Sequence, residues 1–329
     1  MTLLASLRGR LSLPVIASPL FIISVPDLVV AQCCAGVIGS MPSLNARPLS
    51  QLDEWLGEIR ERLAAHDAAH PEAPAAPFAI NLIVHRSNDR LEQDLELCAR
   101  HRVPLIITSL GARREVNEAI HAYGGHVMHD VINQRFAHSA IDKGADGLIL
   151  VAAGAGGHAG SLSPFALVQE TRAWFDGPVA LSGAIANGRS ILAAQAMGAD
   201  FAYIGSAFIA TEEARAAEAY KRMIVESGAG DIVYSNLFTD VHGNYLRGSI
   251  ANAGLDPDNL AASDPSRMDF SSDRKKAWKD IWGSGQGIGA IRAVEPAAAL
   301  IARLRREYAA ARLELRERPA LLRAGTVEA

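Results

Sequence analysis

The sequence predicts an α/β protein folded as a (β/α)₈ TIM barrel with an appended C-terminal lid or subdomain. Short apolar runs typical of strands alternate with helical patterns, which indicates βα units and a parallel sheet. Eight such units follow one another without a domain break, and glycine-rich loops come after the seventh and eighth runs. An open, doubly wound sheet could also hold eight parallel strands. The unbroken rhythm and the paired loops favour a closed barrel.

The expected strands are apolar runs, and a plausible helix follows each of them. They are Val15–Phe21, Val37–Met41, Phe78–Val84, Leu105–Leu110, His126–Val131, Gly147–Ala152, Pro178–Gly183 and Phe201–Ile209.

Several helices can be placed by their first residues. Pro26 is expected in the first turn of one helix, a favoured position for proline. Asn187, and Ser163 followed by Pro164, are typical of helix starts. An apolar stripe at helical spacing is formed by Leu52, Leu56, Ile59 and Leu63. The Ala-, His- and Pro-rich stretch Ala65–Pro77 is expected to be a surface loop.

The βα rhythm stops after Thr211, so we assign residues 1–211 to the barrel. Residues 212–282 combine helical patches, turn signals such as Asp264-Pro265, and aromatic residues, and we expect them to form the lid or subdomain. The aromatic residues are Tyr234, Phe238, Tyr245, Phe270, Trp278 and Trp282. Residues 283–329 are expected to return to the barrel and to end in a charged amphipathic helix, Glu295 to Arg318.

Composition limits the partners and the compartment. The chain has 329 residues, 49% of them hydrophobic, and its 32 basic and 36 acidic residues are mixed along the sequence. No basic stripe is available to follow a nucleic acid backbone. The three cysteines imply no disulfide framework, which suits a reducing cytosol. Polar residues and prolines interrupt the apolar segment Val15–Val30, so we expect a cytoplasmic protein without a membrane span; a homo-oligomer stays open.

One histidine lies within a glycine-rich loop. The sixth strand leads into Ala155-Gly156-Gly157-His158-Ala159-Gly160, which a barrel places at its carboxyl-terminal face, where substrates and cofactors bind. Glycines let the backbone approach a ligand closely, and the imidazole is the loop's only ionisable group. For most histidines a structural role is the better reading. For His158 the composition of the loop favours a functional role.

The loops after the seventh and eighth strands, Ser182–Arg189 and Tyr203–Phe208, are typical of a phosphate site. Main-chain N–H groups from both loops and the start of the following helix would converge on the phosphate. Two tight turns without a ligand are the alternative. No GxGxxG opens the first helix and no Walker motif occurs. In the third strand Asn81 lies between apolar residues, where burial is costly unless its amide is paired, and a flavin ring edge or ribityl hydroxyl would suit it.

These motifs together resemble the nitronate monooxygenases, formerly called 2-nitropropane dioxygenases. The resemblance rests on the glycine–histidine loop, on Ala79-Ile80-Asn81-Leu82, Ser182-Gly183-Ala184-Ile185 and Ile204-Gly205-Ser206, and it resumes at Trp282–Gly287. It implies a flavoenzyme that binds FMN at the barrel mouth and oxidises small nitronates, such as propionate 3-nitronate, with O₂ to a carbonyl compound and nitrite-type products. His158 would face the substrate as the catalytic residue.

The resemblance also implies a set of FMN-binding residues. These are Ala17, Ser18, Pro19, Asn81, Ala155, Gly156, Gly157, Ser182, Gly183, Ala184, Gly205, Ser206 and Gln286. The first three would put main chain against the flavin ring, Asn81 would bond to it, and the loops around residues 183 and 205 would hold the phosphate. No metal site is implied.

The sequence departs from several relatives at one position. Where they have a lysine at the end of the fifth strand, this chain has His129-Asp130. Loss of that cation counts against the main competing hypothesis, an FMN-dependent NAD(P)H reductase of quinones or enoyl thioesters. A non-catalytic phosphate- or flavin-binding barrel is a further alternative, and His158 argues against it. A cysteine nucleophile is excluded by placement, because Cys33, Cys34 and Cys98 fall on expected helices.

Overall fold

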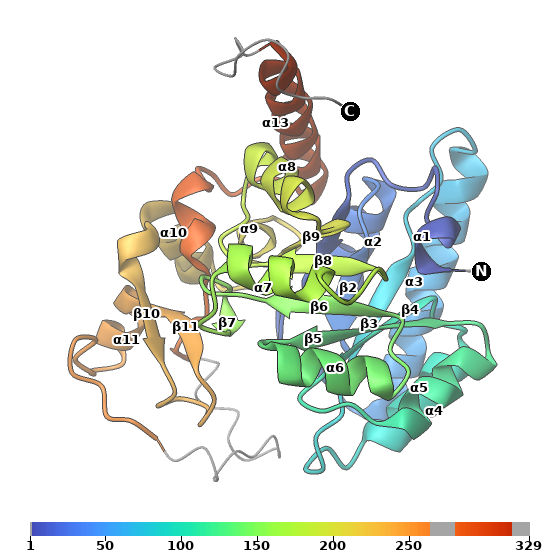
Figure 1. The fold of residues 1–329 in the computed structure, drawn as a ribbon, viewed down its shortest axis with the longest axis horizontal. Coiled ribbons are helices and arrows are strands. Elements are labelled where there is room, and N and C mark those ends of the chain that lie inside the picture. Colours follow the sequence, from blue (N-terminus) through green and yellow to red (C-terminus); the bar gives the residue numbers. More distant parts are fainter. Residues whose placement is uncertain (1, 264–279, 318–329) are drawn as a thin grey trace.

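A closed barrel of eight parallel strands forms the centre of the molecule, seen in a computed structural model that describes residues 2–263 and 280–317 (Figure 1). The strands are β1 (Val15–Ala17), β2 (Gly39–Pro42), β3 (Phe78–Ile83), β4 (Leu105–Ser109), β5 (His126–Val131), β6 (Gly147–Val151), β8 (Val179–Ser182) and β9 (Phe201–Ile204). They are paired in the order β1-β9-β8-β6-β5-β4-β3-β2.

The first and last strands of that order pair through Ile16 and Ile38. The N–H of Ala17 donates to the carbonyl of Ile38 at 2.8 Å, and the N–H of Ile38 donates to the carbonyl of Val15 at 3.1 Å. The predicted barrel is therefore confirmed, and the open sheet is excluded.

All eight expected strands are present; four end one residue early, and β1 and β9 end four and five residues earlier than predicted. β1 stops at Ala17, shortly before Pro19, which has no N–H for a ladder, and the chain turns at residues 21–23. β9 stops at Ile204, and Ser206–Ile209 forms the short helix α9. The predictions of Val15–Phe21 and Phe201–Ile209 were wrong in their last residues.

Helices follow the strands and cover the outside of the barrel (Figure 1). They are α2 (Pro26–Cys34), α3 (Leu49–Ala69), α4 (Leu91–Arg100), α5 (Arg114–Ala122), α6 (Gln134–Asp142), α7 (Pro164–Arg172) and α8 (Gly188–Met197). Pro26 opens α2, Ser163 precedes α7, and the Asn187 side chain caps α8, as predicted. The surface loop expected from Ala65 was wrong at its start, because α3 continues through four alanines to Ala69.

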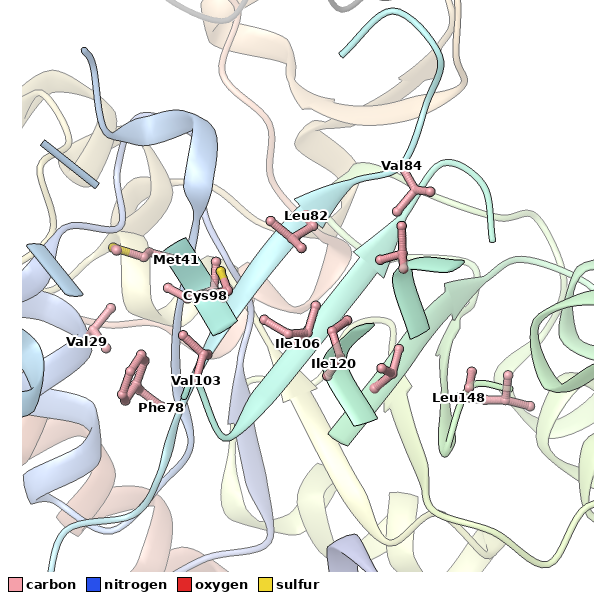
Figure 2. Close-up of a cluster of buried hydrophobic side chains, with 14 of the residues drawn as sticks. Val29, Met41, Phe78, Leu82, Val84, Cys98, Val103, Ile106, Ile120 and Leu148 are labelled. Atoms are coloured by element: carbon pink, nitrogen blue, oxygen red, sulfur yellow. The ribbon is translucent and has the colours of Figure 1, made fainter. Parts of the chain in front are cut away.

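Strand residues alternate between the barrel interior and the helical layer. The inward side chains include Ile16, Ile38, Ala79, Ile107, Met128, Ile149, Ala180 and Phe201. Leu3 and Leu7, in or directly after the short helix α1 (Leu3–Ser6), join this inner cluster. Figure 2 shows the outward side: Leu82 and Ile106 of the strands lie with Cys98 of α4 and Ile120 of α5 in one buried cluster.

The chain after the barrel adds a small sheet and a long helix. α10 (Glu218–Glu226) is followed by β10 (Ile232–Ser235), β11 (Gly243–Leu246) and α11 (Arg247–Asn252). β10 pairs with β11, and β11 pairs with β7 (Gly157–His158), which belongs to the glycine-rich loop. α13 (Ala297–Glu317) contacts both α8 and α2 and so packs between the helices of the seventh and first βα units (Figure 1).

Some sequence predictions fall outside the described residues. They are the Asp264-Pro265 turn, Phe270, Trp278 and the expected helix end at Arg318. None of the helices in the described ranges is long and apolar enough to cross a membrane.

We expect Ile107→Ala to lower the free energy of unfolding by about 2–5 kcal/mol, because it removes a fully buried side chain from the closed interior. Leu313→Ala, at a position 53% exposed on α13, should change stability by less than about 0.5 kcal/mol. Urea titration of both variants measures the difference. Equal stabilities would contradict a packed barrel interior.

Candidate active site

A cavity of about 1400 Å³ opens at the carboxyl-terminal ends of the barrel strands. It exceeds the roughly 300–1,000 Å³ of ordinary small-molecule sites, so a cofactor and a substrate can share it. Every site residue predicted from the sequence lines this cavity except Ala17 and Gln286. Ala17 is fully buried in β1, and Gln286 lies exposed in the 3₁₀ helix Gln286–Ala290.

His158 reaches the cavity on β7, which pairs antiparallel with β11 so that His158 lies opposite Gly243. Its Nε2 lies 3.0 Å from Oγ1 of Thr239. The Thr239 hydroxyl lies 3.2 Å from the Tyr245 hydroxyl, which connects the imidazole to the core of the added sheet. Burial lowers the pKa of His158 to about 4, so the ring is neutral at neutral pH.

The glycines around His158 have a packing role that the sequence did not reveal. A Cβ on Gly156 would lie 2.8 Å from the main-chain nitrogen of Gly285, and a Cβ on Gly285 would lie 2.6 Å from the carbonyl oxygen of Gly154. The N–H of Gln286 donates to that same carbonyl at 2.9 Å. Two backbone segments therefore touch directly, and the chain returning after residue 282 supports the histidine loop.

Main-chain donors from two loops line the same cavity. Gly183 and Ile185 follow β8, and Gly205 and Ser206 follow β9. Within the described ranges, no protein hydrogen bond is donated by the N–H of any of these four residues. Donors facing a cavity without a protein acceptor suit an anionic ligand, because a phosphate oxygen can accept from several of them.

The start of α8 was the third element expected at the phosphate, but two of its N–H groups already donate to protein acceptors. The N–H of Gly188 donates to Oε2 of Glu307 on α13 at 2.9 Å, and the N–H of Ser190 donates to the side chain of Asn187 at 2.8 Å. A carboxylate is stabilised at a helix N-terminus just as a phosphate is. Protein acceptors therefore satisfy two of the donors at this helix start, and the two loops supply the donors that have none.

The amide of Asn81 is oriented by the barrel. Its Nδ2 donates to the carbonyl of Ile107 at 3.0 Å and to Oγ of Ser109 at 2.7 Å. Both amide protons are thereby used, and Oδ1 remains as an acceptor. The sequence suggested that Asn81 could both donate and accept towards a ligand. The structure leaves it the accepting role.

Three inward-facing residues at this level were not singled out as ligand-binding from the sequence. Oγ of Ser109 donates to Oδ2 of Asp130 at 2.5 Å. Burial raises the pKa of Asp130 to about 6, against the lowering effect of hydrogen bonds from Ser109 and from the main chain of Leu110. Tyr203 hydrogen-bonds to Ser18 and lies close enough to Asp130 for its own pKa to be raised further. The alternation of side chains along each strand could have predicted these residues, because it places them inward at the ends of their strands.

The pair at the end of β5 separates onto two faces. Nδ1 of His129 lies 2.6 Å from Oγ1 of Thr108, another residue of outward register on the neighbouring strand. Burial lowers the pKa of His129 to about 4. At the carboxyl end of β5, Asp130 therefore directs its carboxyl inward to Ser109, while the imidazole of His129 contacts Thr108.

A (β/α)₈ barrel that gathers main-chain donors, a half-buried carboxyl and one imidazole at the carboxyl ends of its strands has the architecture of an enzyme. A family model of nitronate monooxygenase matches residues 7–307. The chain is similar to a nitronate monooxygenase of Paraburkholderia phytofirmans, with 27% identity over 92% of this chain and 94% of the relative.

Solved structures support the same fold. A nitroalkane oxidase of Streptomyces ansochromogenes superimposes with a TM-score of 0.79 at 23% identity, covering 94% of this chain and 99% of that one. FabK of Thermotoga maritima gives 0.76 at 22% identity, covering 96% and 98%. The chain belongs to the nitronate monooxygenase family and is a flavin-dependent oxidoreductase.

We expect two imidazoles, the half-buried His158 and the buried His129, to make the protein sensitive to acid. Because the pKa of His158 is lowered from 6.5 to about 4, its contribution to stability is complete above pH 6.5 and is lost as the pH falls to about 4. Over that interval His158 should cost the wild-type protein about 1–3 kcal/mol of its free energy of unfolding, and His158→Gln should not show this loss. His129→Gln should act in the same direction.

Urea unfolding of each variant at pH 7 and pH 4.5, compared with wild type, measures the effect. His66→Gln, on α3 away from the cavity, serves as the control. An unchanged pH dependence in His158→Gln would show that this ring is not held in its neutral form.

Proposed function

We propose that the protein is an FMN-dependent nitronate monooxygenase that oxidises small alkyl nitronates, such as propionate 3-nitronate, with O₂. The products would be a carbonyl compound and nitrite-type nitrogen oxides. The observation that supports this most strongly is the meeting of three features in one cavity: four N–H donors without protein acceptors, the Asn81 carbonyl, and the neutral His158.

The residues present fit FMN. A phosphate would accept hydrogen bonds from the N–H groups of Gly183, Ile185, Gly205 and Ser206, which have no other acceptor in the described ranges. Oδ1 of Asn81 would accept from an N–H of the flavin ring. When bound, the flavin supplies the electron-transfer chemistry, and the protein supplies position and electrostatics.

His158 has a defined task in this proposal. A neutral imidazole can take the α-proton of a nitroalkane, which converts that neutral compound into the nitronate. A nitronate supplied as such has already lost this proton. Its negative charge next to the ring would raise the pKa of His158 and favour the protonated form, which would stabilise the bound anion.

We propose that the segment after the barrel, residues 212–282, serves as a lid. Tyr234, Phe238, Thr239 and His242 line the cavity together with the barrel loops. β10 and β11 join β7, so the lid and the His158 loop share one sheet. This arrangement would keep bulk water from the reacting atoms.

One observation favours a second candidate function, an FMN-dependent NAD(P)H reductase of quinones or enoyl thioesters. The cavity volume of about 1400 Å³ leaves room for a second large ligand. Anaerobic mixing separates the two candidates. Prompt bleaching of the bound flavin by NADH or NADPH favours the reductase, whereas bleaching by a nitronate without a nicotinamide favours the oxygenase.

We expect His158→Ala to keep its flavin and to lose about 10²–10⁴-fold in kcat/KM on a neutral nitroalkane, since it lacks the proton acceptor. The loss on the preformed nitronate should be much smaller. Oxygen uptake with both substrates measures this, and His66→Ala should match wild type. Unchanged turnover of the nitroalkane would remove His158 from the base role.

The N–H cradle predicts a preference for FMN over riboflavin of at least about 100-fold. Two charge-assisted hydrogen bonds of about 1.5 kcal/mol each already give this ratio. Fluorescence titration of flavin-free protein with both compounds measures it. Equal affinities would mean that these N–H groups do not hold the phosphate.

A further inference from the structure

We propose that Asp130 positions and tunes the flavin: it acts through Ser109 to hold the Asn81 carbonyl towards the cavity, and it takes up a proton when electrons enter the bound ring. This inference rests on the proposed function, since it assumes FMN in the cavity. Asp130 lies on the inward face of β5, and its side chain lines the cavity.

A directed chain of hydrogen bonds connects the three residues. Ser109 has one hydroxyl proton, and it goes to Oδ2 of Asp130 at 2.5 Å. Oγ of Ser109 can therefore only accept from Nδ2 of Asn81, which lies 2.7 Å away. The second Nδ2 proton goes to the carbonyl of Ile107 at 3.0 Å. The carboxylate thus sets the direction of the chain, and Oδ1 of Asn81 is left to face the ligand.

The main chain of Leu110 also hydrogen-bonds to the carboxyl of Asp130. Leu110 adopts φ = 61°, in the left-handed region that residues with a side chain rarely occupy. Unusual backbone conformations are retained where the surrounding structure enforces them, often at functional sites.

The surroundings of Asp130 contain hydroxyl groups. Ser109 approaches from β4, and Tyr203, which hydrogen-bonds to Ser18, approaches from β9. On its own strand, His129 takes the opposite register and contacts Thr108. In the described part of the chain, Asp130 forms no ion pair, and no charged group contributes to the shift of its pKa. The Lys143 ammonium, whose charge acts on His129, donates to the carbonyl of Ala112. Burial raises the pKa of Asp130 to about 6.

A carboxyl at this position affects the reduction of the flavin differently from a cation. Two electrons delivered to the ring, by a nitronate in the reaction or by dithionite in an experiment, make the ring more negative. The proton affinity of Asp130 then rises, and its carboxylate takes one proton from solvent, which offsets one of the added charges. No other bond of Asp130 forms or breaks. A fixed cation would offset the charge at every pH, whereas Asp130 makes reduction pH-dependent.

The test is the midpoint potential of the FMN-loaded protein, measured with dithionite from pH 5 to pH 8. Above about pH 6, where Asp130 is ionised before reduction, wild type should show an extra slope of about 30 mV per pH unit relative to Asp130→Asn. This value corresponds to one proton, because a tenfold change in an equilibrium constant is 29.6 mV for a two-electron couple. Asp130→Ala is a second variant with the same expected loss.

Two further variants separate the parts of the proposal. His129→Gln, on the other face of the same strand, should keep the extra slope. Ser109→Ala breaks the link to Asn81 and should weaken FMN binding about tenfold while keeping Asp130 titratable. Equal slopes in wild type and both Asp130 variants, with FMN bound and nitronate oxidised, would overturn this inference alone. A wild-type protein that binds no FMN would overturn the proposed function and this inference together.

Discussion

The pairing of β1 with both β9 and β2 is the constraint on which the site depends. Once the sheet is closed, side chains of one register point into a space that only the strand residues can fill. The lower part of this space is apolar, with Ile107, Met128 and Ile149 in contact. The uppermost inward residues face the cavity, and there Asn81, Ser109 and Asp130 replace aliphatic side chains. Because the barrel is closed, these last inward residues of separate strands lie together and form the polar floor of the cavity.

The loops above that floor satisfy a second constraint, the pairing of buried polar groups. N–H groups without protein acceptors are tolerated where a ligand or water completes them. The start of α8 shows the contrast, since Glu307 accepts from the N–H of Gly188 and Asn187 accepts from that of Ser190. The remaining donors of Gly183, Ile185, Gly205 and Ser206 therefore define where an anion can bind. The phosphate end of the site is built from backbone, and its chemistry is largely independent of side-chain identity.

Features that depend on local pattern could be predicted from the sequence. All eight strands, the cap at Asn187 and the placement of His158 at the barrel mouth follow from periodicity and turn residues. Contacts between distant segments could not be predicted. Glu307 reaches the start of α8 across 119 positions, and Gly285 packs on the loop at Gly156. The glycines of that loop looked like room for a ligand, but backbone contact within the protein already requires some of them.

The floor and the loops together are proposed to bind one flavin, with its phosphate at the four N–H groups. A crystal structure of the protein with FMN would show this arrangement. We expect phosphate oxygens within hydrogen-bond distance of the N–H groups of Gly205 and Ser206, and the ring above Asn81 with His158 on its open side. A phosphate bound elsewhere, or these N–H groups bonded to protein atoms in the complex, would mean that the two loops do not form the phosphate site.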